Sequence, residues 1–428
     1  LQEYDSSADK ECLIEDHVMM HVLGVILAMQ YSVKKGIQLF GDRGKQSATS
    51  ELQQLHNMAT FIPVHAHELT REQRKQALAS LMFMTEKRCG RVKSRACANG
   101  SKQRQWIRKE DAMSPTVMGD SVMITSAIEA HERRKVITLD IPGAFLNADL
   151  DEEVIMLLRG ELAEMMVTIN PALYGPYVIT TKRGEKLLYV KMLKAMYGLM
   201  RAALLFYLKL CADLQEYGFT MNEYDPCVAN KMIDGKQLTV TWHVDDLKAS
   251  HENEFELTKL VMFLAKKYGD QITVHHGTMH DYLGMDMDYS IDGVVRLSMV
   301  KHLEKIFADF PEDIGRASSS PASEYLFQVR DPEEAEKMGM FLPPEKAEQF
   351  HHSIAQLLFI STKVRRDIQT PVAFLTTRVK RPDEDDWGKL KRVLKYLKGT
   401  RHMKLTLSVD DISTIWWWVD SSYNVHPD

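Results

Sequence analysis

Alternating apolar and polar positions predict a β-hairpin over residues 238–248. β-Branched and aromatic side chains fill both arms, and two adjacent carboxylates, Asp245 and Asp246, stand at the turn between them. Residues 134–146 form a second such stretch, in which an apolar strand ends at Asp140 and runs into a Pro-Gly turn. The hydrophobic pattern therefore predicts two strands that end in acidic turns.

Helical and strand patterns fill most of the remaining chain. A capping signal at Thr70 predicts a helix that runs to Met84. Apolar periodicity predicts further helices over 117–131, 194–217, 254–268, 299–310 and 345–398, and strands over 188–191, 281–287, 293–298 and 416–420. A polar, Pro-bearing connector over 318–344 is the clearest domain boundary.

A run of basic residues over 86–104 predicts a second hairpin. Strand alternation places Arg91, Lys93 and Arg95 on one face of it. From the residues alone, this face fits a solvated strand edge, where lysine commonly blocks unwanted pairing.

The acidic turns allow two interpretations. Asp is an ordinary turn residue, so Asp245 and Asp246 fit a solvated turn. Adjacent like charges also suit a hard cation such as Mg²⁺, which is held by a few carboxylates and by substrate phosphates. If Asp140 lies on a neighbouring strand of the same sheet, three carboxylates converge. Such a cluster holds two divalent ions for in-line attack at phosphorus.

Composition sets broad limits on the chain. With 428 residues and 45% hydrophobic content, it is long enough for two or three subdomains. The net charge of −5 gives no global signal for nucleic-acid binding, which must therefore come from local basic patches. Five scattered cysteines fit a reducing interior. No targeting signal is evident, and the apolar run 18–31 is too short for a membrane span. The start at Leu1 suggests a piece of a larger polyprotein or an incomplete gene model.

Four motifs resemble those of one known family. They are D-x-x-x-A-F-L-x-x-x-L at Asp140–Leu150, L-Y-V-K-x-x-K-A-x-Y-G-L at Leu188–Leu199, E-Y-D-P-C-V at Glu223–Val228, and x-V-D-D at His243–Asp246. Their order and spacing are similar to those of the reverse transcriptase region of copia-type (Pseudoviridae-like) LTR-retrotransposon Pol polyproteins. The resemblance extends from about Lys87 to the C-terminal end.

The resemblance implies an α+β right-hand polymerase with fingers, a palm built on an antiparallel sheet, and a thumb. A mostly helical connection segment and the first strand of a truncated RNase H-like domain would follow. The implied division is 1–69 as linker or N-terminal helical region, 70–300 as fingers and palm, 301–344 as thumb and connector, 345–410 as connection helices, and 411–428 as the start of the RNase H-like domain.

The resemblance also implies roles for individual residues. The catalytic, metal-binding acids would be Asp140, Asp245 and Asp246, with two Mg²⁺ ions, or Mn²⁺ in their place. The dNTP would contact Lys93, Arg95, Gly143, Ala144, Phe145, Tyr197 and Gly198; the primer end would rest on His243 and Val244; and Asp420 would be a remnant RNase H acid. Phe145 stands where related polymerases have a steric gate against ribose, with a core aromatic as the alternative. His243 replaces the Tyr of most reverse transcriptases.

A basic stripe on the last predicted helix has two interpretations. Its members are Lys389, Lys391, Arg392, Lys395 and Lys398. They fit either contacts along a nucleic-acid duplex or a solvated helix face.

The expected function is RNA-directed DNA polymerisation. The expected partners are an RNA template, a DNA or RNA primer and dNTPs, with integrase upstream and RNase H downstream as polyprotein parts outside this chain. We expect no membrane association and an intracellular location, either cytoplasmic in virus-like particles or nuclear. The alternatives are a catalytically inactive transposon remnant and a non-catalytic nucleic-acid-binding module of a polyprotein.

Overall fold

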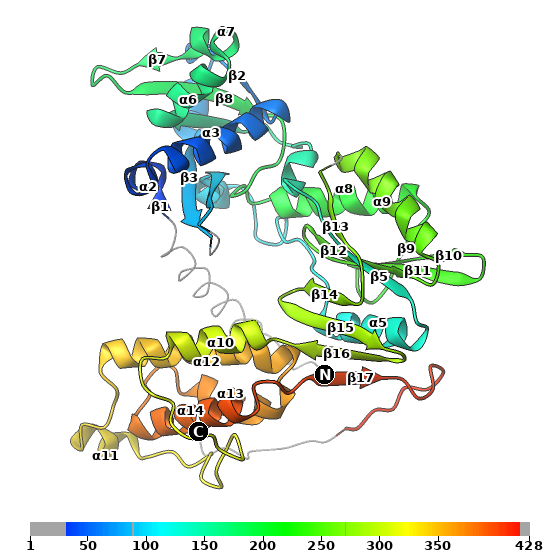
Figure 1. The fold of residues 1–428 in the computed structure, drawn as a ribbon. Coiled ribbons are helices and arrows are strands. Elements are labelled where there is room, and N and C mark those ends of the chain that lie inside the picture. Colours follow the sequence, from blue (N-terminus) through cyan, green and yellow to red (C-terminus); the bar gives the residue numbers. More distant parts are fainter. Residues whose placement is uncertain (1–30, 88–89, 270, 420–428) are drawn as a thin grey trace, which may run out of the picture.

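Three lobes surround a central hollow in the computed structural model, which describes residues 31–87, 90–269 and 271–419 (Figure 1). We call them fingers, palm and thumb, after the architecture that the resemblance implies. In Figure 1 the fingers lie at the top, the palm at the right and the thumb below. No helix in the described ranges is long and apolar enough to cross a membrane.

The fingers are built on one mixed sheet. Its strand order is β1 (Tyr31–Ser32), β3 (Leu78–Glu86), β6 (Ile155–Arg159), β8 (Lys186–Met192) and β2 (Phe61–Pro63), with β4 (Val92–Ala98) paired to β3 and β7 (Ile179–Thr180) paired to β8. Its helices are α2 (Val33–Phe40), α3 (Asp42–Asn57), α4 (Arg71–Gln76), α6 (Glu161–Ile169) and α7 (Pro171–Tyr174).

Two expectations for the fingers are corrected. The capping box at Thr70 is present, but its helix ends at Gln76, and residues 78–86 form β3 instead of a helix to Met84. Pairing of residues 80–86 with β4, and of Leu78 and Ala79 with β6, outweighs the local helical pattern. The region 1–69 was expected to be a linker or an N-terminal helical region, and it contains helices α2 and α3. It is not a linker, because β1 pairs with β3 and β2 pairs with β8, so its described part belongs to the fingers.

The palm is a six-stranded antiparallel sheet, as expected. Its order is β13 (Thr273–His275), β5 (Lys135–Asp140), β12 (Asp246–His251), β11 (Lys236–His243), β10 (Val228–Ile233) and β9 (Thr220–Met221). Its helices are α5 (Gly119–His131), α8 (Ala202–Glu216) and α9 (Glu254–Tyr268). The apolar residues of the central strands, among them Leu139, Leu247 and Val240, are buried, and this fixes the strand register that positions the acids.

A buried polar cluster joins the palm sheet to α5. The ammonium of Lys248 on β12 lies 2.7 and 2.8 Å from the two carboxylate oxygens of Glu129 and 3.0 Å from Ser126 Oγ. The hydroxyl of Tyr289, from the next sheet, donates to Glu129 at 2.6 Å. The Lys248 and Glu129 side chains are 0% and 2% exposed, so this ion pair is fully removed from solvent.

The thumb combines a small sheet with a helical bundle. The sheet order is β14 (Met279–Tyr282), β15 (Met285–Ile291), β16 (Val294–Ser298) and β17 (Leu405–Ser408), and the helices are α10 (Val300–Asp309), α11 (Pro332–Lys337), α12 (Pro344–Lys363), α13 (Gln369–Thr377) and α14 (Glu384–Gly399). Phe310 stacks on Trp387, which joins α10 to α14. The expected thumb and connection helices therefore form one bundle.

Two strands predicted in the C-terminal half of the chain differ from the structure. The strand expected over 281–287 breaks at Leu283 and Gly284, which both have positive φ and turn β14 into β15. Residues 416–419, expected to begin an RNase H strand, form no strand, and Trp416 to Trp418 are exposed. Asp420 lies outside the described residues.

Candidate active site

Three carboxylates meet where two palm strands end. Asp140 closes β5, and in the antiparallel ladder it lies directly opposite Asp246, the first residue of β12. Asp246 is also the cross-strand partner of His243. The amide of Ile141 donates to the carbonyl oxygen of Asp245 at 3.3 Å, which joins the end of β5 to the turn of the hairpin. The expected convergence of the three acids is therefore present.

The turn that carries Asp245 has a strained backbone. Val244 has φ of +59° whereas Asp245 does not have a positive φ, the pattern of a two-residue type II′ hairpin turn. Glycine usually occupies the position of Val244, and a β-branched residue there costs about 1–3 kcal/mol. Such a turn keeps the Asp245 carboxylate at the tip, beside the end of β5. His243 is half-buried, and burial lowers the pKa of its imidazole.

The acids shift one another's protonation. Burial raises the pKa of Asp245, and the charge of Asp140 adds to the effect. The pKa of Asp246 is raised to about 6 by burial and by the charges of Asp245, Asp140 and Asp281. Asp281 was not expected near the site, since only the turn after β14 brings it there.

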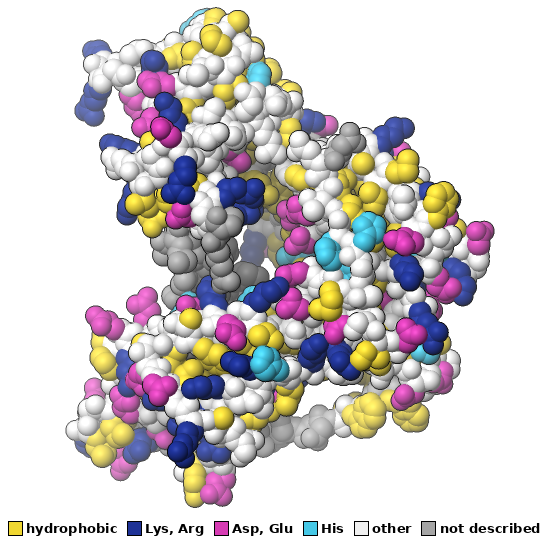
Figure 2. Space-filling view, viewed as in Figure 1, with side chains coloured by type: hydrophobic (Ala, Val, Ile, Leu, Met, Phe, Trp, Pro, Cys, Tyr) yellow, Lys and Arg dark blue, Asp and Glu magenta, His cyan; other side chains and the backbone are white. Residues whose placement is uncertain are grey.

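A cavity of about 190 Å³ brings these acids face to face with the basic hairpin. Lys93 and Arg95 enter it from β4, and Asp140 and Asp245 line the opposite side. Strand alternation is as expected, with Lys93 and Arg95 exposed while Ser94 and the other alternate residues of β4 are buried. Figure 2 shows Lys and Arg side chains of the fingers across the central hollow from Asp and Glu side chains of the palm.

Only some of the other residues expected to contact the nucleotide line this cavity. Gly143 and Tyr197 line it. Ala144 is fully buried, and the Phe145 ring packs edge-on against Tyr197 with centroids 4.6 Å apart. The Arg95 guanidinium lies over the Tyr197 ring at 4.9 Å.

Gly198 packs directly against Ala98, the last residue of β4. A side chain there would lie 2.0 Å from the carbonyl oxygen of Ala98, and its φ is +89°, so only glycine fits. The amide of Ala98 donates to the carbonyl of Tyr197 at 2.8 Å. The motif turn at 197–198 therefore supports the end of the basic strand.

Helix α3 supplies residues that sequence reasoning missed. The carboxylate of Glu51 accepts a hydrogen bond from the amide of Ala96 at 3.0 Å, and Ser47 Oγ donates to the carbonyl of Val92 at 3.1 Å. These two hydrogen bonds satisfy backbone groups on the edge of β4 that does not pair with β3. Glu51 and Gln54 also line the cavity. A helix from a presumed linker gave no signal of this role, because the contacts form only in the folded chain.

The charge of Glu51 balances the basic side chains. Burial lowers the pKa of the Lys93 ammonium, and Arg95 and Lys87 lower it further, while Glu51 and Asp140 raise it. Burial in turn raises the pKa of Glu51, against the effects of the Ala96 amide, Lys93 and Arg95. The cavity therefore holds cations and anions side by side.

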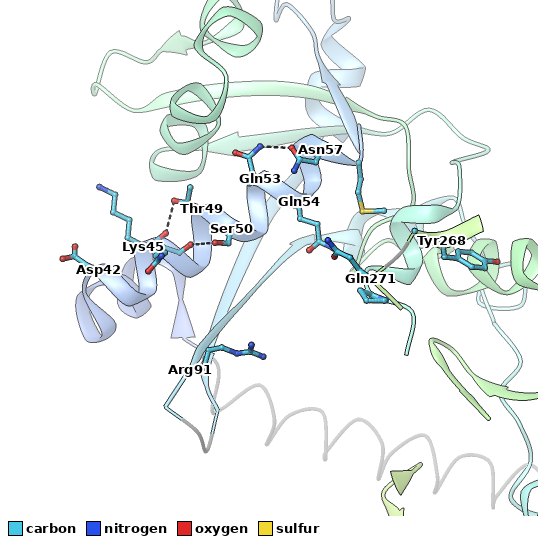
Figure 3. Close-up of a pocket in the computed structure, with 14 residues that line it drawn as sticks. Asp42, Lys45, Thr49, Ser50, Gln53, Gln54, Asn57, Arg91, Tyr268 and Gln271 are labelled. Carbon is cyan, nitrogen blue, oxygen red and sulfur yellow. Dashed lines mark hydrogen bonds between the residues drawn. The ribbon is translucent and has the colours of Figure 1, made fainter. Parts of the chain in front are cut away.

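A wider polar groove adjoins the cavity. It has a volume of about 1460 Å³ and shares Gln54 and Pro142 with the cavity. One face of α3 forms one wall, and Tyr268 and Gln271 lie across from it, as Figure 3 shows. Arg91 reaches it from the basic hairpin. The cavity thus opens to solvent along α3.

The acids suit a divalent ion whose other ligands come from a substrate. In the described ranges, no group of three His, Cys, Asp or Glu side chains is spaced to enclose a metal by itself. Mg²⁺ commonly takes only one or two carboxylates and completes its shell with water and phosphate oxygens. Asp140 and Asp245 line one cavity and neither has an ion-pair partner among the described residues, so they fit that arrangement.

Removal of one charge from this cluster should stabilise the fold. Folding raises the pKa of Asp246 to about 6, so the folded state favours the protonated carboxyl group. The protonated group stabilises the fold at low pH, and this contribution is lost as pH rises through 6. In EDTA at pH 7.5 we expect Asp246→Asn to raise the thermal midpoint by about 2 °C, since solvent screening limits the gain to about 1 kcal/mol. Thermal unfolding between pH 5 and 8 measures this.

Asp288 provides a matched control, because the same substitution there should shift the thermal midpoint in the opposite direction. Ser290 and Lys404 lower the pKa of Asp288 to about 2, so that carboxylate stabilises the fold above its ordinary pKa. Asp288→Asn should lower the midpoint at pH 7.5. Equal shifts in both variants would contradict the role of repulsion at Asp246.

Comparison with known proteins identifies the family. Residues 73–319, more than half of the chain, match the family model described as reverse transcriptase (RNA-dependent DNA polymerase). The Pol polyprotein from transposon TNT 1-94 of Nicotiana tabacum is 24% identical over 72% of this chain, and that from transposon RE2 of Arabidopsis thaliana is 23% identical over 74%. The chain spans only about a fifth of those relatives, 22% and 20% of their lengths. The putative transposon Ty5-1 protein of Saccharomyces cerevisiae is 24% identical, over 62% of this chain and 77% of its own length.

Solved structures give weaker likenesses. A foamy viral protease-reverse transcriptase in complex with double-stranded DNA superposes with a TM-score of 0.44 at 12% identity, over 82% of this chain and 48% of that one. Telomerase from Candida albicans superposes with a TM-score of 0.33 at 9% identity, over 81% of this chain and 64% of that one. The assignment rests on the family model and the retrotransposon relatives. The chain belongs to the reverse transcriptase (RNA-dependent DNA polymerase) family, as the reverse transcriptase region of a copia-type retrotransposon Pol polyprotein.

Proposed function

We propose that this chain is an RNA-directed DNA polymerase that adds deoxynucleotides to a primer 3′-OH. The observation that supports this most is the single cavity that joins Asp140 and Asp245 of the palm to Lys93 and Arg95 of the fingers. An acid pair faces two cations, which is the charge arrangement that a nucleoside triphosphate with divalent cations requires. The partners are then a template RNA, a primer and dNTPs.

Each wall has a separate task in this reaction. Asp140 and Asp245 would hold two Mg²⁺ ions, and these ions would supply positive charge to activate the primer hydroxyl and to neutralise the triphosphate. Lys93 and Arg95 bind the triphosphate oxygens from the fingers side. Asp246, opposite Asp140, adds negative charge at the edge of the site. His243 and Val244 support the primer end from the adjoining hairpin.

Phe145 is proposed as the gate that excludes ribonucleotides. Its ring is fixed against Tyr197, which itself lines the cavity. We expect Phe145→Ala to lower discrimination against rNTPs by about 10- to 100-fold, because a steric clash of this kind costs about 1–3 kcal/mol. The ratio of kcat/KM for dNTP and rNTP measures this. Phe145→Tyr should keep the selectivity, and an unchanged ratio in Phe145→Ala would assign the ring to the core alone.

Glu51 is proposed to position the basic strand. Loss of its bond to the Ala96 amide costs about 1–1.5 kcal/mol, so Glu51→Ala should raise KM for dNTP by about tenfold with little change in kcat. Glu51→Gln keeps an acceptor oxygen and should restore KM. Steady-state kinetics at saturating template–primer separates the two constants.

The matched control is Glu86, a carboxylate of the β3–β4 hairpin itself. Glu86 ends β3 and pairs with Arg43 at 3.0 Å, and the cavity walls do not include it. Glu86→Ala should leave KM unchanged. If Glu51→Gln were as impaired as Glu51→Ala, the charge rather than the hydrogen bond would be responsible.

Primer extension tests the proposed function directly. The purified chain is given an RNA template, a DNA primer, dNTPs and Mg²⁺, and we expect extension products that depend on the divalent ion. A folded chain that binds template–primer but never extends it would instead support a catalytically inactive remnant or a non-catalytic binding module.

A further inference from the structure

A second hollow lies in the thumb, separate from the catalytic cavity. It has a volume of about 500 Å³ and lies between residues 316–326 of the connector and helix α14. In Figure 1 the connector follows the lower edge of the helical bundle, on the side away from the fingers. Its basic residues are Arg316 from the connector and Lys389, Arg392 and Lys395 from α14. The three on α14 follow a three-residue spacing, which places them along one side of the helix.

The contacts on α14 divide its basic stripe into two groups. Lys391 pairs with Glu312 at 2.7 Å, Lys398 donates to the carbonyl of Gly315 at 3.0 Å, and Lys389 pairs with Asp385 at 3.0 Å. These three cations are already satisfied by the protein. The stripe expected from the sequence is therefore not one uniform surface.

The remaining cations have no anionic partner. Among the described residues, the side chains of Arg316, Arg392 and Lys395 make no ion pair or hydrogen bond. Arg392 and Lys395 are half-buried, and the Nε of Arg392 is buried without an acceptor. A cation that loses water without gaining a partner costs free energy, so the hollow favours an anion that supplies one.

The walls suit a phosphate group. Guanidinium groups bind phosphate oxygens through paired hydrogen bonds, and an ammonium adds a point charge. Ser318 and Ser323 add hydroxyl groups on the connector wall. The only acid of the lining, Asp385, is already paired with Lys389. The whole chain has a net charge of −5, so this concentration of unpaired cations is a local feature.

We propose that this hollow binds a phosphodiester group of the nucleic acid that the chain holds, at a site remote from the catalytic acids. Arg392 and Lys395 contact the phosphate from α14, and Arg316 closes over it from the connector. A continuous strand that occupies both this hollow and the catalytic cleft would be held at two points. The site therefore adds affinity for nucleic acid without taking part in nucleotide transfer.

The salt dependence of binding tests the proposal. Fluorescence anisotropy of a labelled RNA–DNA hybrid is measured with the whole chain over a range of NaCl concentrations. Each phosphate contact contributes about 0.9 to the slope of log K against log salt. We expect Arg392→Gln with Lys395→Gln to remove the one phosphate contact and to reduce the slope by about 0.9. Lys391→Gln with Lys398→Gln removes the same charge from the same helix and should change it by less than half as much.

The outcomes separate the alternatives. Equal slopes in both double variants would overturn the proposal, since general electrostatics would then explain binding. Calorimetric titration with inorganic phosphate tests whether free phosphate is the ligand instead. The nucleic-acid assignment would be overturned if the Arg392 and Lys395 changes abolished phosphate binding but left the salt dependence of nucleic-acid binding unchanged. If the double variant unfolds, the exposed Arg316→Gln alone should reduce the slope by about 0.9. Because binding needs no catalysis, a chain that fails to extend primers can still pass this test.

Discussion

Asp245→Asn should abolish primer extension while the chain remains folded. The change removes one of the two aspartate carboxylates that line the cavity and keeps the size of the side chain. Metal-assisted stabilisation of charge at phosphorus is worth several kcal/mol, so we expect a loss of at least about 10³-fold in kcat. Single-turnover primer extension with saturating dNTP and Mg²⁺ measures it. The same variant should bind template–primer with nearly the parent affinity.

A neighbouring acid provides the control for Asp245. Asp281 contributes to the electrostatics of Asp246 but lines no part of the cavity, and its carboxylate lies 3.5 Å from Lys301. Asp281→Asn removes the same charge and should retain extension within about threefold of the parent. Full activity in Asp245→Asn would refute the assignment of this carboxylate, whereas equal losses in both variants would indicate a general effect of charge.

Lys248→Met should give the largest loss of stability of any single change considered. It leaves the buried carboxylate of Glu129 on α5 without its cation, and an unpaired buried charge of this kind costs about 3–5 kcal/mol. The Tyr289 hydroxyl still donates to Glu129, which offsets only part of the cost. The free energy of unfolding in urea measures the change.

The double replacement gives the decisive comparison. Lys248→Met with Glu129→Leu removes both charges and should recover most of the stability, because a buried ion pair gains little over apolar residues of similar volume. Lys259→Met is the control, since its ammonium pairs with Glu256 at 2.8 Å but is 47% exposed, and it should cost less than about 1 kcal/mol. A double variant as unstable as Lys248→Met would refute the explanation.

Much of the palm could be predicted from the sequence because its signals are local. β-Branched arms around Asp245 and Asp246 give the hairpin, and an apolar run gives the strand that ends at Asp140. Helix α9 has the expected bounds because its N-cap Asn253 and C-terminal Gly269 mark both ends. Register then follows from which side chains the sheet must bury.

The rest depends on contacts between distant segments. Residues 78–84 read as helix but become strand because β4 and β6 pair with them. No local pattern marks Glu51 as a neighbour of Lys93, since α3 reaches β4 only in the folded fingers. The same holds for Lys248, whose alternation in β12 predicts a strand but not a buried partner on α5.

Helix α3 has a practical consequence for anyone who dissects this chain. The matched family segment, residues 73–319, contains all three acids and the whole basic hairpin, yet α3 precedes it. A fragment trimmed to that segment would expose the outer edge of β4, with the Val92 carbonyl and the Ala96 amide unsatisfied, and would invite strand-to-strand aggregation. Supplied separately, a peptide of residues 42–57 should dock on that edge and restore solubility, which makes α3 a candidate for fragment complementation.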